Sequence, residues 1–324
     1  MAVFTEVSPK EVAGLLAQYN IGEFVSMKGI TSGIENTNYY VSTDRGCFVL
    51  TIFERLTAQE LPFYLQLCRH LGNKGLPVSA PEVNRNEGLL SFIKDKPCAI
   101  AECLPGQSVE IASADLCAQL GTVLAQMHLG TVDFPLLQKN TKGLQFWISS
   151  LPLLKPHMSE NNYQLLEDEV EHQKKLFETV YPNLERGAVH ADLFRNNALV
   201  EEAGGSQKLG GIIDFYFACT APYIYDLAVT VNDWCIDLAT GEFIPEKVHA
   251  LLNAYNKVRP LSDIEKDCWQ DSLRAAACRF WVSRLYDFYL PREASLLKPH
   301  DPTHFERILR LRKAMDPESL PWVQ

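Results

Sequence analysis

The chain has 324 residues, of which 47% are hydrophobic and 22% charged, and its formal net charge is -10 at pH 7. This composition excludes a disordered or fibrous chain, and the length suits two lobes or domains better than one compact core. The acidic balance argues against nucleic acid as the main partner, because phosphate binding requires clustered Lys and Arg.

The N-terminal third predicts a helix followed by a β-rich region. "SPKEVAGLLAQYN" starts with Ser8 as a helix cap, Pro9 in the first turn and Glu11 completing a capping box. "EFVSMKGITSGIENTNYYVSTDRGCFVLTIFER" predicts three strands, because glycines separate runs of β-forming residues. "TAQELPFYLQLCRHLGNKG" predicts a helix, and "LLSFIKDKPCAIAECLPG" predicts two further strands that end before Pro105.

The rest of the chain is mainly helical in pattern. "SADLCAQLGTVLAQMHLG" and "SENNYQLLEDEVEHQKKLFETVY" both have helical periodicity, and the residues after Pro222 continue in the same way. The predicted fold class is therefore α+β with two lobes. A β-rich N-terminal lobe covers residues 1–104, and a helical C-terminal lobe covers residues 105–324.

The nine cysteines form no CxxC motif and none lies beside a His at metal-ligand spacing. They are expected to be free, mostly buried thiols in a reducing cytoplasm. The first residues, "MAVFTEVSPKEV", lack the segments of a signal peptide, and no apolar run approaches the ~20 residues that span a bilayer. We therefore expect a cytoplasmic protein without a membrane partner.

The most informative polar residues lie between two strand-like segments, in "HADLFRNNALV" and "GGIIDFY". Phosphoryl transfer requires a carboxylate that orients the attacking hydroxyl and metal ions that bridge the phosphates. Asp192 can accept the hydroxyl proton, while Asn197 and Asp214 offer the oxygen ligands that Mg²⁺ prefers. A short hairpin between them is expected to return Asp214 close to Asn197. Asp192 alone would be better explained as a loop carboxylate that caps the backbone.

These residues also carry a family resemblance. "HADLFRNN" matches the kinase loop H-x-D-x-x-x-x-N, and "IIDF" in place of "DFG" resembles the aminoglycoside phosphotransferase family. Longer strings, among them "GIENTNYYV", "YDLAVTVNDWC" and "RFWVSRL", are similar to bacterial homoserine kinases of this type, and they spread over residues 29–285. The resemblance implies a two-lobed protein-kinase-like fold, with His190 and Asp226 as structural supports of the catalytic loop.

A glycine-rich turn precedes this loop in the order that kinase-like folds require. In "GITSGIENTNYYV", Gly29 and Gly33 permit close backbone approach, and Ser32 and Asn36 offer donors for ATP phosphates. A plain hairpin turn would explain the two glycines equally well. The motif is not a Walker loop, which needs Gly-Lys-Ser/Thr.

The sequence departs from the kinase pattern in the third strand, where Thr51 stands at the position of the usual Lys or Arg. Arg55 or Lys28 could supply the missing charge. Glu60 is the natural partner of such a cation, but Thr57-x-x-Glu60 is also a capping box.

The connector "CAIAECLPG" is expected to lie under the adenine. Backbone groups of Glu102, Cys103 and Leu104 would make the base contacts, although the side chains fit an ordinary buried strand equally well.

Two helices offer candidates for substrate binding. In "YDLAVTVNDWC", Asp226, Thr230 and Asp233 share one helix face, so Asp233 could meet a substrate ammonium group or could be a surface Asp. In "DSLRAAACRFWVSRLYDFY", Arg279 or Arg284 could hold a carboxylate. Five positions correspond to about 140° around a helix, so the two arginines are not expected to face the same spot.

A buried structural role for each Arg is the alternative. Tyr216, just after Asp214, could line the pocket, although packing explains it as well.

The expected activity is transfer of the γ-phosphate of ATP, with Mg²⁺, to the hydroxyl of L-homoserine, giving O-phospho-L-homoserine on the route to threonine. Choline, ethanolamine, hydroxylysine, an aminoglycoside or a thio-sugar are alternative acceptors. A nucleotide-binding module without catalysis is the alternative from another class, supported only by Thr51. Monomer and homodimer both remain open.

Overall fold

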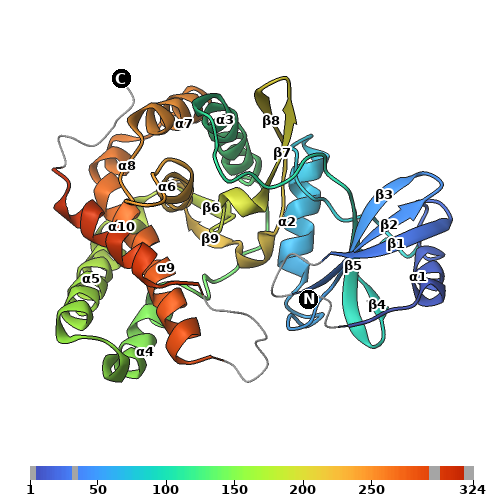
Figure 1. Cartoon of the computed structure of the whole chain (residues 1–324), viewed down its shortest axis with the longest axis horizontal. Coiled ribbons are helices and arrows are strands. Elements are labelled where there is room, and N and C mark those ends of the chain that lie inside the picture. The colour runs from blue at the N-terminus through green and yellow to red at the C-terminus, as the bar shows by residue number, and fades with distance from the viewer. Residues whose placement is uncertain (1–4, 31–35, 292–299, 317–324) are drawn as a thin grey trace. The chain divides into compact units, whose positions relative to one another are not determined.

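A computed structural model describes residues 5–30, 36–291 and 300–316. The chain forms two compact units (Figure 1). The first contains the described residues up to Gly106 together with Gly210–Tyr216, and the second contains Gln107–Leu209 and the residues from Phe217 onward. The assignment of residues 1–104 to nucleotide binding and of residues 105–324 to catalysis stays a prediction.

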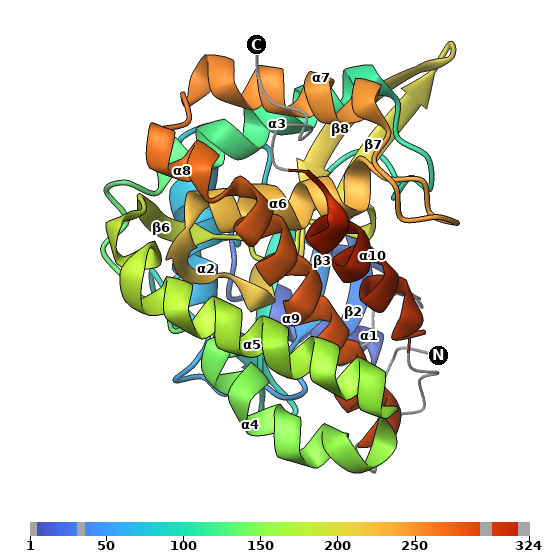
Figure 2. The same ribbon diagram turned by 90° about the vertical axis from the view of Figure 1, so that its left-hand side faces the viewer.

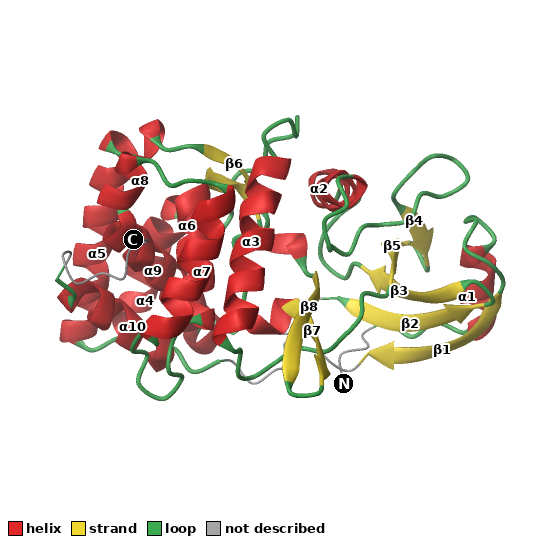
Figure 3. Ribbon diagram, turned by 90° about the horizontal axis from the view of Figure 1, so that it is seen from above, coloured by secondary structure: helices red, strands yellow, loops and turns green. Residues whose placement is uncertain are grey.

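The first unit contains a five-stranded antiparallel sheet in the order β1-β2-β3-β5-β4 (Figure 3). All five strands and both helices were predicted from the sequence. Their bounds are α1 Pro9–Leu16, β1 Phe24–Ile30, β2 Thr37–Thr43, β3 Gly46–Ile52, α2 Pro62–Asn73, β4 Ser91–Ile93 and β5 Lys96–Glu102.

Alternation along the strands directs one face of this sheet toward α1. In β3, Phe48, Leu50 and Ile52 are buried, as expected from the period of two residues in a strand. They share a hydrophobic cluster with Val12 and Leu16 of α1. The predicted capping box begins this helix, because Glu11 accepts the N–H of Ser8 while the Ser8 hydroxyl accepts the N–H of Glu11.

The second unit is mainly helical (Figure 2). Its α-helices are α3 Ala114–Gly130, α4 Leu144–Leu154, α5 Glu160–Thr179, α6 Tyr223–Trp234, α7 Pro245–Val258, α8 Asp263–Asp267, α9 Trp269–Tyr289 and α10 Thr303–Ala314. Its strands are β6 Arg186–Val189, β7 Ala198–Ala203 and β9 Cys219–Pro222, while β8 Ser206–Ile212 runs from this unit into the first. Short 3₁₀ helices are η1 Lys155–His157, η2 Tyr181–Asn183, η3 Arg195–Asn197 and η4 Phe215–Phe217.

Helix α6 is the centre of this unit. Every one of its residues is buried, which is typical of a helix that neighbouring elements surround. It contacts α9, β6 and β9. Because buried polar groups require hydrogen-bond partners, the carboxylates of Asp226 and Asp233 on this helix must be paired.

The strand β9 was not predicted from the sequence. It has only four residues and ends in a proline, and its pairing with β6 is a tertiary contact that local pattern does not encode. Within the described ranges, no helix has both the length and the apolar character needed to cross a lipid bilayer.

Candidate active site

The loop between β6 and η3 carries a strained backbone that a buried carboxylate holds in place. Ala191 has a φ of 62°, in the left-handed region that residues other than glycine rarely adopt. Its N–H donates to Asp226 Oδ1 at 2.6 Å, and the N–H of His190 donates to Oδ2 at 3.1 Å. Asp226 therefore fixes the backbone that immediately precedes Asp192.

A buried network in turn positions Asp226. His128 Nε2 lies 2.9 Å from Asp226 Oδ2, and His128 Nδ1 lies 2.7 Å from the Tyr255 hydroxyl. Burial lowers the pKa of His128 despite the neighbouring carboxylate, so the neutral ring donates from Nε2 and accepts at Nδ1. Burial by itself raises the pKa of Asp226, but hydrogen bonds from His128 and Ala191 outweigh it and lower that pKa, so the carboxylate stays ionised.

Asp192 and Asn197 lie at the two ends of the same short loop. Asn197 Nδ2 donates to the Asp192 carbonyl at 2.8 Å and to Oδ2 of its carboxylate at 3.2 Å. The amide oxygen of Asn197 is then the atom that can ligate a cation. His190 is fully buried, and its Nδ1 lies 3.3 Å from the N–H of Asp192. This contact agrees with a bracing role for His190.

Asp214 lies in the first unit and is exposed, and its backbone is also strained, with a φ of 62°. Strain of this kind costs on the order of 1–3 kcal/mol and gathers at functional sites. A carboxylate and an amide oxygen fit Mg²⁺, which keeps several waters and usually takes only one or two protein ligands beside the substrate phosphates. Among the described residues, no three His, Cys, Asp or Glu side chains gather at metal-binding distance. The meeting of Asp214 with Asn197 stays a prediction.

Two glycines in β8 let the chain that leads to Asp214 pass directly along the connector. A methyl group on Gly210 would overlap the carbonyl of Pro105, and one on Gly211 would lie 2.5 Å from the Leu104 side chain. Of the three predicted adenine-contacting residues, Glu102 ends β5 opposite Phe48, and Cys103 and Leu104 follow it.

The predicted phosphate-binding turn is only partly within the described residues. Gly29 lies in β1 opposite Tyr39, and the carbonyl of Asn36 lies 3.4 Å from Asn38 Nδ2. Ser32 and Gly33 lie outside the described residues.

Thr51, at the expected cation position, donates to Asn38 Oδ1 at 2.8 Å. Glu60 accepts the N–H and hydroxyl of Thr57 at 2.9 and 2.8 Å, but these contacts lie in the turn before α2, whose N-cap is Leu61, so Thr57 and Glu60 do not cap that helix. Tyr216 packs edge-on against Phe53, with 5.0 Å between the ring centroids.

The two arginines of α9 reach one aromatic cluster. Arg279 lies 3.7 Å from the Phe280 ring and Arg284 lies 4.4 Å from the Phe305 ring, and these rings stack with centroids 5.0 Å apart. The two guanidinium groups lie over different rings of this cluster, and the expectation that they face different spots stays a prediction. Arg279 Nη2 lies 3.5 Å from Asp192 Oδ1.

Arg284 differs from Arg279 in its partners. Within the part of the chain that the structure describes, its guanidinium makes no hydrogen bond or ion pair. Burial lowers its pKa to about 10, and the charges of Asp233, Arg279 and Asp192 also act on it. A half-buried cation of this kind favours an anionic ligand.

Asp233 pairs with a residue that sequence reasoning missed. It accepts the backbone N–H of Arg195 at 2.9 Å and the side-chain Nε–H at 3.0 Å. Arg195 stands inside the "HADLFRNN" string, so the loop motif itself contained the signal. His128 was missed as well, although it ends the helical string "LGTVLAQMH".

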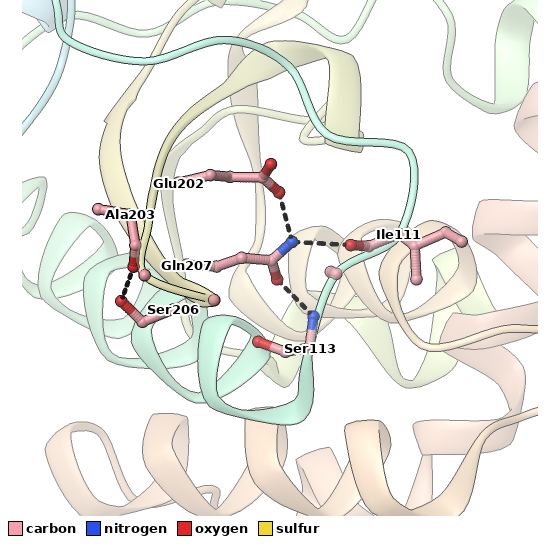
Figure 4. A pocket seen from close by; sticks show the side chains of 9 residues that line it. Ile111, Ser113, Glu202, Ala203, Ser206 and Gln207 are labelled. Atoms are coloured by element: carbon pink, nitrogen blue, oxygen red, sulfur yellow. Dashed lines mark hydrogen bonds between the residues drawn. The ribbon is translucent and has the colours of Figure 1, made fainter.

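A cavity of about 460 Å³ lies elsewhere in the second unit, between the turn of the β7–β8 hairpin and the start of α3 (Figure 4). Gln207 spans it, donating to the Ile111 carbonyl and to Glu202 while accepting the N–H of Ser113. These polar groups satisfy one another's hydrogen bonds. We therefore interpret Gln207 as a support for the hairpin and do not interpret the cavity as a ligand site.

Comparison with solved structures defines the class. The amicoumacin kinase hAmiN, solved with AMP-PNP, Ca²⁺ and Ami, aligns with a TM-score of 0.68 over 98% of this chain and 95% of that chain, at 16% identity. The fold is therefore the two-lobed, protein-kinase-like fold of such phosphotransferases, as predicted.

The model of the phosphotransferase enzyme family matches residues 26–261, and the chain belongs to that family. A homoserine kinase of Cupriavidus necator is 50% identical over 100% of both chains. One of Burkholderia multivorans is 47% identical over 100% of this chain and 99% of its own.

Proposed function

We propose that the chain is an ATP-dependent homoserine kinase. It transfers the γ-phosphate of ATP to the hydroxyl of L-homoserine and forms O-phospho-L-homoserine, a step of threonine biosynthesis. The observation that carries the proposal is the near 50% identity to homoserine kinases along the entire chain. The loop geometry supports it, because a dedicated buried carboxylate holds the backbone next to Asp192.

Asp192 accepts the proton of the attacking hydroxyl. The neighbouring guanidinium of Arg279 orients its carboxylate, and Asn197 restrains it from the other side. Asn197 and Asp214 would hold Mg²⁺, which would supply positive charge to neutralise the phosphates. Gly29, Ser32, Gly33 and Asn36 approach the phosphates.

The adenine contacts come from the backbone of the connector. Glu102, Cys103 and Leu104 supply them, and the close passage of Gly211 against Leu104 supports this segment.

The acceptor site is assigned from the charges around the aromatic cluster. Arg284 binds the carboxylate of homoserine, because its half-buried guanidinium lies beside the aromatic cluster and makes no hydrogen bond or ion pair among the described residues. Asp233 meets the ammonium group, exchanging part of its contact with Arg195. Arg279 lies beside Asp192. Tyr216 packs against Phe53 in the first unit.

A kinetic panel tests the acceptor. Purified protein with ATP and Mg²⁺ is assayed against L-homoserine, choline, ethanolamine, hydroxylysine, an aminoglycoside and a thio-sugar. Homoserine is expected to give the highest kcat/KM, by at least a hundredfold over the acceptors that lack a carboxylate, because a site built around a charged carboxylate partner rejects them. A higher kcat/KM with choline or ethanolamine would overturn the assignment. ATP binding without turnover of any acceptor would favour the non-catalytic module.

We further propose a cytoplasmic location, for which the nine free thiols are the support. A monomer and a homodimer both fit the proposed chemistry.

A further inference from the structure

Two cysteines that are far apart in the sequence face each other across the sheet of the first unit. Cys47 in β3 and Cys103 just after β5 extend the ladder in which Phe48 opposes Glu102. The N–H of Cys103 donates to the Cys47 carbonyl at 3.0 Å. A hydrogen-bonded antiparallel pair separates Cα atoms by about 5.5 Å, which lies inside the range of about 4.4–6.8 Å that disulfides span.

Their sulfur atoms already lie almost within bonding reach. Cys47 Sγ is 2.7 Å from Cys103 Sγ, compared with about 2.05 Å in a disulfide. The backbones are fixed by the ladder, so closing the remaining gap requires only small side-chain movements.

Accessibility separates this pair from the other close pair of thiols. Cys47 is exposed and Cys103 is half-buried. Cys117 and Cys235 also interact through their side chains, but both are buried in the second unit. Burial raises the pKa of the Cys103 thiol to about 12, so the sulfur that an oxidant reaches first is that of Cys47.

We propose that Cys47 and Cys103 form a reversible disulfide in the folded protein when a peroxide is the oxidant, and that this bond weakens ATP binding. The Cys47 thiolate attacks one peroxide oxygen, the O–O bond breaks and sulfenic acid forms, and the departing hydroxide takes up the proton that the thiol released, giving one water. The Cys103 sulfur then attacks Cys47 sulfur, and the hydroxyl leaves with the Cys103 proton as a second water. Both sulfurs are oxidised by one electron each, and the two peroxide oxygens are reduced.

The expected effect on ATP rests on the proposed function, because Cys103 belongs to the connector assigned to adenine. A covalent bond to β3 restricts this segment more than a ladder hydrogen bond does. Any adjustment of the connector to the purine must then strain the disulfide. The acceptor contacts lie in the second unit, and the cross-link joins residues of the first unit only.

The full-length protein is treated with hydrogen peroxide and mapped by mass spectrometry of non-reduced peptides. ATP affinity is measured by titration calorimetry without an acceptor. We expect a Cys47–Cys103 disulfide, an at least threefold weaker ATP affinity and reversal of both by dithiothreitol. Cys117 and Cys235 should stay reduced. Absence of the 47–103 disulfide in the folded protein, or its formation with unchanged ATP affinity, would overturn the proposal.

Cys47→Ser is the decisive variant, because an exposed position tolerates it without loss of folding. It should keep the ATP affinity of the reduced protein and lose the response to peroxide, whereas the control Cys235→Ala should keep the response. A response that persists in Cys47→Ser would exclude this pair as its origin. Mapping and calorimetry do not depend on homoserine, so failure of the proposed activity in a turnover assay is recognised separately.

Discussion

The two ends of helix α6 each present an aspartate, but the surroundings of these carboxylates differ. Asp226 and its partner His128 have side chains that are 0% and 1% exposed, and Asp226 also accepts two backbone N–H groups. Asp233 and Arg195 are 11% and 15% exposed, and their pairing joins two charged groups. The first arrangement holds backbone in place, while the second remains open to exchange with a charged substrate.

This difference teaches which end should control stability and which should control turnover. A buried carboxylate with every partner fixed can be removed only at the expense of folding. The charged groups at the other end, together with Asp192 and Arg284, are reachable and can change partners during the reaction.

The largest expected effect is on the open side, at Asp192. Asp192→Asn should lower kcat with homoserine by about a thousandfold, because the amide cannot accept the hydroxyl proton. ATP affinity should be retained and Tm should change by less than about 2 °C. Steady-state kinetics, calorimetry and thermal unfolding measure the three quantities. The control is Asn196→Ala, whose side chain is exposed near the same loop and which should have near-normal kcat. If Asp192→Asn also had near-normal kcat, the proposed role of the Asp192 carboxylate would be refuted.

At the buried end, Asp226→Asn should reduce the free energy of unfolding by about 3 kcal/mol, because an NH₂ group replaces one of the two oxygens and the N–H groups of His190 and Ala191 can no longer both be accepted. Urea unfolding measures the loss. Asp263→Asn provides a control, since this side chain is 99% exposed and should change stability by no more than about 0.5 kcal/mol. Equal stabilities of the two variants would remove the distinction between the ends of α6.

The two arginines of α9 sharpen the comparison within the open end. Arg284→Lys should raise KM for homoserine about tenfold with little change in KM for ATP, because Lys cannot bind a carboxylate in a bidentate manner. Arg279→Lys should mainly lower kcat, since Arg279 contacts Asp192 rather than an unpaired substrate group. If Arg284→Lys mainly lowered kcat and Arg279→Lys mainly raised KM for homoserine, the roles assigned to the two arginines would have to be exchanged.

The smallest effect concerns pH at the buried end. Burial lowers the pKa of His128, so the unfolded chain binds a proton near pH 6.5 more readily than the native protein does. The free energy of unfolding should therefore be fully maintained above pH 6.5 and should fall below it, by at most about 1.4 kcal/mol per pH unit from this group. His128→Gln should flatten the dependence of stability on pH between 6.5 and 5. An unchanged slope would assign the acid sensitivity to other groups.

Local pattern predicted the elements well where the signal is local. The capping box at Ser8, the strand β3 and the helix α3 depend on near neighbours in sequence, and all three are confirmed. The loop motif predicted that Asp192 and Asn197 belong together, and they share a hydrogen bond.

Pairings between distant residues could not be predicted in the same way. Asp233 was expected to face a substrate, but its ion pair with Arg195 depends on how α6 packs beneath the loop. The contact of Cys47 with Cys103 depends on strand register over an interval of 56 positions, although the cysteines look scattered along the chain. For the arginines of α9, only the angle between their helix positions could be read from the sequence. The rings and the carboxylate that their long side chains reach could not be read from it.

The β7–β8 hairpin has consequences for attaching probes to this protein. Its tip at Gly204 and Gly205 has open space around both residues, whereas a single methyl group at Gly210 would collide with Pro105. An affinity tag inserted between the two glycines has room there, provided that both are kept, because their φ angles of 59° and 82° disfavour other residues. Labelling at Gly210 would disturb the strand that leads to Asp214. Engineering for single-molecule measurements has a usable position and a forbidden one on the same strand pair.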